Sequence, residues 1–183
     1  FKLRNYYGMR SGICHQVMVD FGWVVPGELI VGTDSHTTTY GALGAAGTGI
    51  GFSEMAYVFA TGKLWFKVPE TIEFFMQGSL PARVTSKDVI LYVAGKYSSD
   101  VAQNKAVEFN GPVAKALSVA GRMTMSNMAM EIGAKFGFFQ PDEKLRRFLS
   151  SRTNRKFELI RSDKDAVYER SYEIDVTGLE PQV

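Results

Sequence analysis

The strongest constraint on the fold is a short polar stretch framed by glycines. An apolar run, Leu29-Ile30-Val31, leads into Asp34-Ser35-His36, and a run rich in glycine and alanine follows as far as Gly51. A carboxylate, a hydroxyl and an imidazole at the end of an expected strand are typical of α/β proteins, whose sites lie at the carboxyl ends of parallel strands. Asp and Ser also stabilise turns through bonds to their own backbone. The triplet therefore predicts an α/β fold and leaves two alternatives for these residues, a functional site or a turn.

Strand and helix patterns alternate along the rest of the chain. Strands are expected over residues 28–31, 71–78, 106–109 and 172–176. Helices are expected from Ser53 onward and over residues 85–95, 113–120, 126–134 and 142–150, with 32–51 as a glycine-rich loop. A break at Val68-Pro69 predicts two lobes, residues 1–66 and 67–183. Charges crowd into residues 151–170, which we expect to form a mobile or surface segment.

Composition and motifs exclude several classes of function. The net charge of +2 gives no support for binding nucleic acid, and no apolar run approaches the roughly 20 residues of a membrane-spanning helix. Gly47-Thr48-Gly49-Ile50-Gly51 does not match the glycine spacing of dinucleotide-binding loops. The single cysteine, Cys14, excludes an internal disulfide framework and a self-contained cysteine-ligated metal site, so a reducing, cytoplasmic setting is expected. Because the chain starts at Phe1 and stops at Val183 without a tail, we also expect it to be part of a longer polypeptide.

Two histidines and two carboxylates are the candidate catalytic groups: His15, His36, Asp34 and Glu131. A carboxylate bonded to an imidazole fixes its tautomer and raises its basicity, which suits proton transfer to a leaving hydroxyl. Spacing alone leaves open which carboxylate meets which ring. The alternatives are also open: His15 as an ordinary core or surface residue, and Glu131 as a carboxylate that faces water.

The order of the motifs resembles the aconitase superfamily over nearly the whole chain. The matching motifs are Gly12-Ile13-Cys14-His15-Gln16, Pro26-Gly27, Gly32-Thr33-Asp34-Ser35-His36-Thr37, Gly41-Ala42-Leu43-Gly44, Gly49-Ile50-Gly51, Thr85-Ser86-Lys87-Asp88-Val89-Ile90-Leu91, Gly111-Pro112, Asn127-Met128 and Glu131-Ile132-Gly133-Ala134. Within the superfamily the chain is most similar to the large subunits of 3-isopropylmalate dehydratase and homoaconitase-type enzymes. The resemblance implies layered α/β/α lobes with a mostly parallel sheet, in a fragment of a larger multi-domain subunit.

The resemblance also implies a reaction and a set of partners. It implies a hydro-lyase that isomerises a hydroxy di- or tricarboxylic acid by dehydration and rehydration on a [4Fe-4S] cluster. A small subunit, the swivelling domain, would carry the serine that removes the carbon-bound proton. Nucleic acid and membrane are not expected partners.

Site residues carry over position by position. His15 matches a histidine that pairs with the aspartate at Asp34, and His36 matches one that pairs with the glutamate at Glu131. Ser35 matches a residue close to substrate and cluster, and Asn127 one in the surroundings of the cluster.

One departure from the family limits the expected activity. The three cysteines that hold the cluster lie C-terminal to the matched region in the family, and Cys14 is not at a ligand position. We therefore expect this chain alone to bind no cluster and to be inactive. Isopropylmalate, homoaconitate, dimethylmalate and citrate all remain candidate substrates. The alternative class of function is a truncated, non-catalytic module for binding or assembly.

Overall fold

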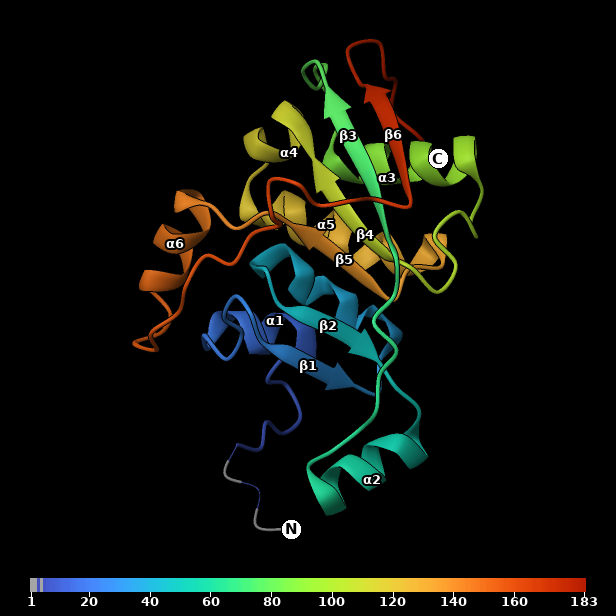
Figure 1. Cartoon of the computed structure of the whole chain (residues 1–183). Coiled ribbons are helices and arrows are strands. Elements are labelled where there is room, and N and C mark those ends of the chain that lie inside the picture. The colour runs from blue at the N-terminus through green and yellow to red at the C-terminus, as the bar shows by residue number, and fades with distance from the viewer. Residues whose placement is uncertain (1–2, 4) are drawn as a thin grey trace.

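The chain forms two parallel sheets with helices between and around them (Figure 1). The computed structural model describes residues 3 and 5–183. The first half contains α1 (Cys14–Asp20), β1 (Leu29–Gly32), the 3-10 helix η1 (Ser35–Leu43), β2 (Ala46–Gly49) and α2 (Phe52–Thr61). The second half contains β3 (Thr71–Gln77), α3 (Ser86–Tyr97), β4 (Ala106–Asn110), α4 (Gly111–Ala116), α5 (Val119–Met128), the 3-10 helix η2 (Ala129–Ile132), β5 (Phe136–Phe139), α6 (Glu143–Ser150) and β6 (Arg170–Asp175).

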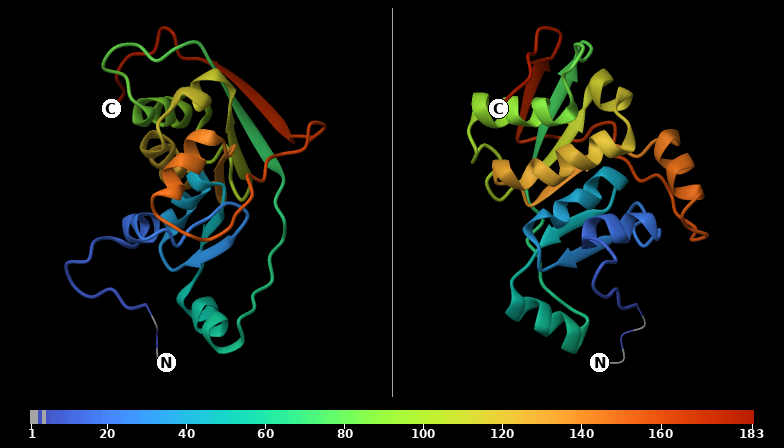
Figure 2. Two further views of the ribbon diagram at one scale, coloured as in Figure 1. Left: turned by 90° about the vertical axis from the view of Figure 1, so that its left-hand side faces the viewer. Right: turned by 180° about the vertical axis from the view of Figure 1, so that it is seen from behind.

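Every strand pairing is parallel, which confirms the predicted α/β class. β1 pairs with β2, and the larger sheet has the order β5-β4-β3-β6. In Figure 2, helices α3, α4 and α5 lie on one face of the larger sheet, and the irregular segment before β6 crosses the other face. No helix among residues 3 and 5–183 combines the length and the apolar character needed to cross a membrane.

The core of the larger sheet follows from the alternation of β3. Ile72, Phe74 and Met76 are buried against the helices, while the residues between them are only partly covered. The Phe74 ring lies 6.1 Å from that of Phe109 and 5.3 Å from that of Tyr172 between ring centroids. Because side chains alternate between the two faces of a strand, this pattern places the aromatic residues of three neighbouring strands in one layer.

The predicted glycine-rich loop over residues 32–51 is wrong, because it contains η1 and β2. Close backbone approach accounts for both elements: a Cβ at Gly41 would overlap the carbonyl of Gly137 on β5, and one at Gly47 would overlap that of Thr37. The expected start of the next helix at Ser53 is also shifted. The N-cap of α2 is Gly51, whose N–H donates to the Glu54 carboxylate at 2.7 Å, and no residue of α2 is buried.

Three helix boundaries also differ from the predicted ones. The α3 helix continues past Gly95 to Tyr97, since a glycine inside a helix costs free energy but does not end it. The predicted helix over 113–120 is interrupted, because Leu117 is extended and Ser118 starts α5 by accepting a bond from the N–H of Gly121 at 3.0 Å. The predicted helix over 126–134 is the end of α5 followed by η2, which stops at Gly133 with a φ of 82°.

Residues 151–169 form no regular element and are attached to the sheet at Glu108. This carboxylate is buried in the middle of β4 and accepts bonds from the hydroxyls of Ser162 at 2.6 Å and Tyr168 at 2.7 Å. A buried carboxylate needs such donors to offset its lost hydration. The segment therefore lies on the surface. Its mobility, like the division into lobes at residues 66–67, stays a prediction.

The start of α3 gives a pH-dependent prediction. The Asp88 carboxylate accepts bonds from the N–H of Gln182 at 2.8 Å and from Thr85, and these bonds lower the pKa of Asp88 to about 2. The folded chain therefore binds fewer protons than the unfolded chain, where an Asp has a pKa of about 3.9. The contribution of the Asp88 carboxylate to the free energy of unfolding is fully present above about pH 4 and is lost as the pH falls toward 2.

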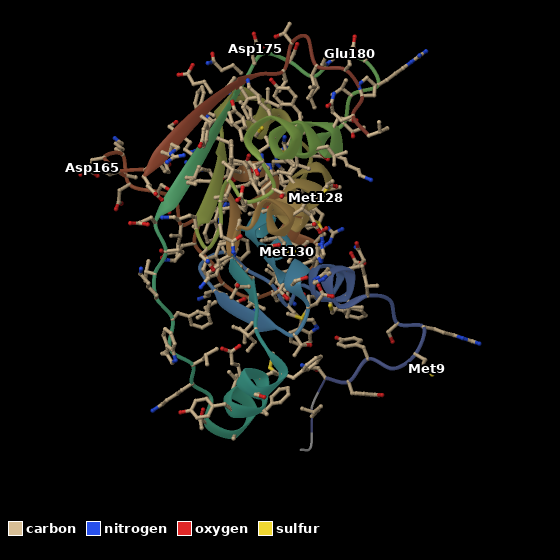
Figure 3. All side chains as sticks on the ribbon, turned by 90° about the vertical axis from the view of Figure 1, so that its right-hand side faces the viewer. Met9, Met128, Met130, Asp165, Asp175 and Glu180 are labelled. Carbon is tan, nitrogen blue, oxygen red and sulfur yellow. The ribbon has the colours of Figure 1, made fainter. Side chains whose placement is uncertain are left out.

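We expect Asp88→Asn to lower the urea midpoint of unfolding at pH 7, with a difference from wild type that shrinks as the pH falls from 4 to 2. Asp165→Asn is the matched control, because Asp165 lies exposed on the segment before β6 (Figure 3). A constant difference between Asp88→Asn and wild type from pH 7 to 2 would contradict the assignment.

Candidate active site

The candidate site begins where β1 ends and η1 starts. Asp34 is the N-cap of η1: its Oδ1 accepts the N–H of His36 at 2.8 Å, and its carbonyl accepts the hydroxyl of Thr37 at 2.6 Å. The same Oδ1 lies 3.0 Å from Nε2 of His15. The structure therefore shows the turn alternative, since Asp34 caps a helix, and the same oxygen also contacts an imidazole; the functional alternative for this triplet stays a prediction.

His15 lies at the start of α1 and is buried, with 8% of its surface exposed. Its ring stands edge-on to the ring of Tyr40, with centroids 5.9 Å apart. With the Nε2 proton directed at Asp34, Nδ1 is left as an acceptor facing the thiol of Cys14, whose sulfur is 3.8 Å away. Burial and the Asp34 contact hold this imidazole in one orientation.

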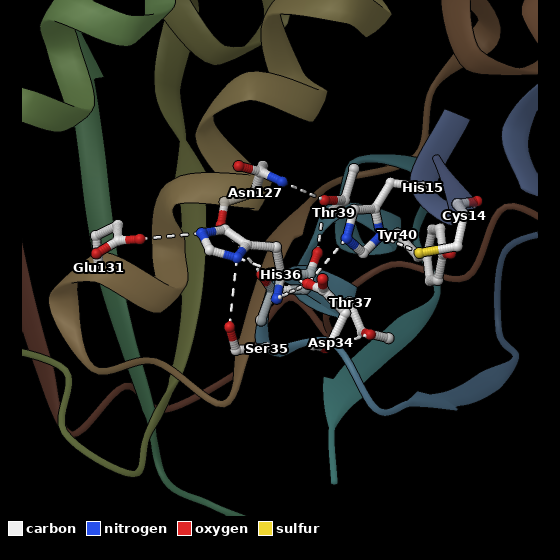
Figure 4. Close-up of polar contacts among 11 residues, drawn as sticks. Cys14, His15, Asp34, Ser35, His36, Thr37, Thr39, Tyr40, Asn127 and Glu131 are labelled. Carbon is white, nitrogen blue, oxygen red and sulfur yellow. Dashed lines mark hydrogen bonds and ion pairs between the residues drawn. The ribbon is translucent and has the colours of Figure 1, made fainter. Parts of the chain in front are cut away.

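His36 forms the second pair, with a carboxylate 95 residues further along the chain. Its Nε2 lies 2.9 Å from Oε1 of Glu131, which η2 carries toward the start of η1 (Figure 4). The hydroxyl of Ser35 lies 3.3 Å from the other ring nitrogen, Nδ1. About a third of the His36 side chain and half of the Glu131 side chain are exposed, so this pair is accessible to a small molecule.

Asn127 joins the second half of the chain to η1 through hydrogen bonds to two threonines. Its side-chain amide donates to the hydroxyl of Thr39 at 2.9 Å, and its backbone carbonyl accepts a bond from the hydroxyl of Thr38 at 3.3 Å. Both threonines are buried, and sequence reasoning missed their contribution. The signal that could have found them is the run of three threonines directly after His36, because buried hydroxyls need partners.

Hydrogen bonding keeps Asp34 ionised. The backbone N–H of His36 is the largest cause that lowers the pKa of Asp34, and the hydrogen bond with His15 lowers it further. Desolvation opposes this shift, as it also raises the pKa of the buried Tyr40 hydroxyl. A carboxylate holds each imidazole in place, an arrangement that suits the delivery or acceptance of protons at the carboxyl end of β1.

The chain does not supply the ligands of an iron-sulfur cluster. Cys14 is the only cysteine of the sequence, and a cluster ligated by three thiolates needs three. Among residues 3 and 5–183, no three His, Cys, Asp or Glu side chains are grouped so that they could hold a metal ion. The residues present therefore do not fit a resident cluster.

The parallel α/β fold brings two imidazole–carboxylate pairs together, and comparison with known proteins identifies the family. A family model described as the aconitase family (aconitate hydratase) matches residues 1–183, so the chain belongs to this family and the resemblance of its motifs is confirmed.

Three relatives define the similarity more closely. The chain is 50% identical over 181 residues to a protein named probable 3-isopropylmalate dehydratase large subunit of Methanothermobacter thermautotrophicus, covering 99% of this chain and 43% of the relative. It is 51% identical over 179 residues to a probable methanogen homoaconitase large subunit of Methanosarcina mazei, covering 98% and 46%. It is 49% identical over 181 residues to a 3-isopropylmalate dehydratase large subunit 1 of Methanopyrus kandleri, covering 99% and 43%. The chain thus spans less than half the length of these relatives.

Proposed function

We propose that this chain is part of the large subunit of a hydro-lyase that isomerises a hydroxy di- or tricarboxylic acid, with 3-isopropylmalate as the first candidate substrate. The observation that carries the proposal is the meeting of the His15–Asp34 and His36–Glu131 pairs at the end of β1, at 3.0 and 2.9 Å. The names of the relatives support this substrate and, through leucine biosynthesis, a cytoplasmic enzyme.

In this proposal His36 acts as the general acid. A carbon–oxygen bond of the substrate breaks while His36 delivers a proton to the departing hydroxyl, which leaves as water, and Glu131 stabilises the imidazolium before transfer. The carbon-bound proton goes to a base outside this chain, expected on a small subunit. Rehydration adds water to the other carbon of the resulting double bond: the water oxygen bonds to that carbon while His36 takes up the water proton, and the base outside this chain returns a proton to the carbon that lost the hydroxyl, with His15 and Asp34 orienting the water.

In this proposal the [4Fe-4S] cluster of the family is held by residues outside the present chain. Its expected ligands are cysteines of the complete large subunit, beyond Val183. Ser35 is proposed to lie near the substrate, and Asn127 to position η1 through Thr39, 2.9 Å from its amide.

The second candidate is a homoaconitase, which the relative from Methanosarcina mazei supports at 51% identity. Dimethylmalate dehydratase and aconitase are further alternatives within the family. A non-catalytic module remains the proposal of a different class, supported by the single cysteine. Downstream cysteines in the complete gene product would favour the enzyme, and a stop codon directly after Val183 would favour the module.

Anaerobic iron-sulfur reconstitution of the complete large subunit with its small subunit tests the proposal. The assembled protein is assayed with isopropylmalate, homoaconitate, dimethylmalate and citrate. We expect turnover of at least one acid, and isopropylmalate to have the highest kcat/KM. An assembled, iron-loaded protein that converts none of the four would overturn the proposed function.

A further inference from the structure

A cavity of about 360 Å³ opens beside the candidate active site. It lies between the carboxyl ends of β1 and β2, the start of α2 and the connection from η2 to β5. Its walls include Ser35, whose hydroxyl is 3.3 Å from the His36 ring, so the cavity and the His36–Glu131 pair are adjacent. A volume of this size lies in the range of small-molecule sites.

Closely packed backbone forms part of the wall of this cavity. A Cβ at Gly49 would come within 2.9 Å of the Ser35 Cα and 3.0 Å of the Asp34 carbonyl. Gly49 therefore allows the end of β2 to pack against the start of η1 without a side chain in between. Thr48 also lines the cavity, and among the described residues its hydroxyl makes no hydrogen bond, which leaves it available as a donor.

One cation lines this cavity. Lys135, directly before β5, is exposed and forms no ion pair among residues 3 and 5–183. The acidic side chain in the lining, Glu54, is already bonded to the N–H of Gly51 at 2.7 Å. The ammonium group of Lys135 is therefore the available partner for an anion in the cavity.

The neighbouring carboxylates repel an acidic ligand, so a cation is needed for such a ligand to bind. Asp34 and Glu131 both present carboxylates at the site, so a dicarboxylate brought to His36 meets repulsion from like charges. The positive charge of Lys135, which lines the same cavity as Ser35, offsets this repulsion.

We propose that the cavity binds one carboxylate group of the substrate, with Lys135 as its counter-charge and the hydroxyls of Ser35 and Thr48 as donors. This inference rests on the proposed function and adds a substrate-binding residue to it. A carboxylate held there directs the hydroxyl-bearing carbon toward His36, because Ser35 belongs to both the cavity and the His36 contact.

The test uses the assembled two-subunit enzyme and four forms of the large subunit: wild type, Lys135→Gln, Lys135→Arg and Lys164→Gln. Lys164 is the matched control, since it is exposed on the segment before β6. Steady-state kinetics gives KM and kcat for whichever of the four acids is converted with the highest kcat/KM. Calorimetry gives the Kd of succinate. Succinate is a dicarboxylate without the hydroxyl to be eliminated.

Lys135→Gln should raise KM and the succinate Kd about tenfold, because a hydrogen bond to a charged group contributes about 1.5–3 kcal/mol and 1.4 kcal/mol is tenfold. Its kcat should change less than about threefold. Lys135→Arg should restore most of the affinity, since it keeps the charge, and Lys164→Gln should match wild type.

The outcomes separate the inference from the proposed function. Wild-type turnover with a KM and a succinate Kd in Lys135→Gln within twofold of wild type overturns the carboxylate site and leaves the function standing. Succinate binding that depends on Lys135 without turnover of any acid supports the site and overturns the function. Neither binding nor turnover in the wild-type enzyme overturns both.

Discussion

Replacing His36 with asparagine in the assembled enzyme should lower kcat for dehydration by about 100- to 10,000-fold, the usual contribution of a positioned general acid. Asparagine keeps a polar side chain but cannot deliver a proton near neutral pH. The Asp34 cap on the start of η1 uses the backbone N–H of residue 36 at 2.8 Å, so the substitution leaves that bond in place. Steady-state kinetics measures the loss, and unchanged iron-sulfur absorbance reports that the variant has assembled.

Glu131→Gln provides the second arm of this experiment. Because Glu131 acts through the ring of His36, the double variant should lose no more activity than His36→Asn alone, as residues that work as a unit are not additive. Glu158→Gln, on the exposed segment after α6, is the matched control and should behave as wild type. A His36→Asn enzyme with kcat within a few fold of wild type would remove His36 from the role of general acid.

Gly41→Ala should lower the stability of the chain more than any other glycine-to-alanine substitution. Gly41 lies on η1 against the backbone of β5, and an added Cβ would overlap the carbonyl of Gly137. Backbone cannot turn away as a flexible side chain can, so η1 and β5 must separate. Overpacking of this kind costs about 3 kcal/mol or more, a large part of the roughly 5–15 kcal/mol that stabilises a domain.

The measurement for Gly41→Ala is soluble yield and the urea midpoint of unfolding, followed by circular dichroism. Gly95→Ala is the control: a Cβ there meets nothing within 4 Å and Gly95 lies inside α3, so alanine should stabilise the chain by about 0.5–1 kcal/mol. A Gly41→Ala chain as stable as wild type would show that η1 and β5 are not in backbone contact.

Local signals predicted the elements whose stability depends on their own pattern. The β-branched and aromatic residues of 71–78 predicted β3, and the amphipathic pattern over 142–150 predicted α6, which Asp142 caps through the N–H of Leu145 at 2.9 Å. The ordered motifs identified the family before any contact was known. In each case the physical cause, a side-chain period or a cap, lies within a few consecutive residues.

Tertiary structure decided what depends on residues far apart. Glycines in residues 32–51 have no conformational preference that predicts a 3-10 helix and a strand, and these form because Gly41 packs on β5 and Gly47 on η1. Spacing left open which carboxylate meets which imidazole. His36 and Glu131 are 95 residues apart, and they meet only because η2 follows α5, which packs along η1. The sequence by itself determined the chemical groups and the family of this protein, while long-range packing determined the geometry in which those groups can act.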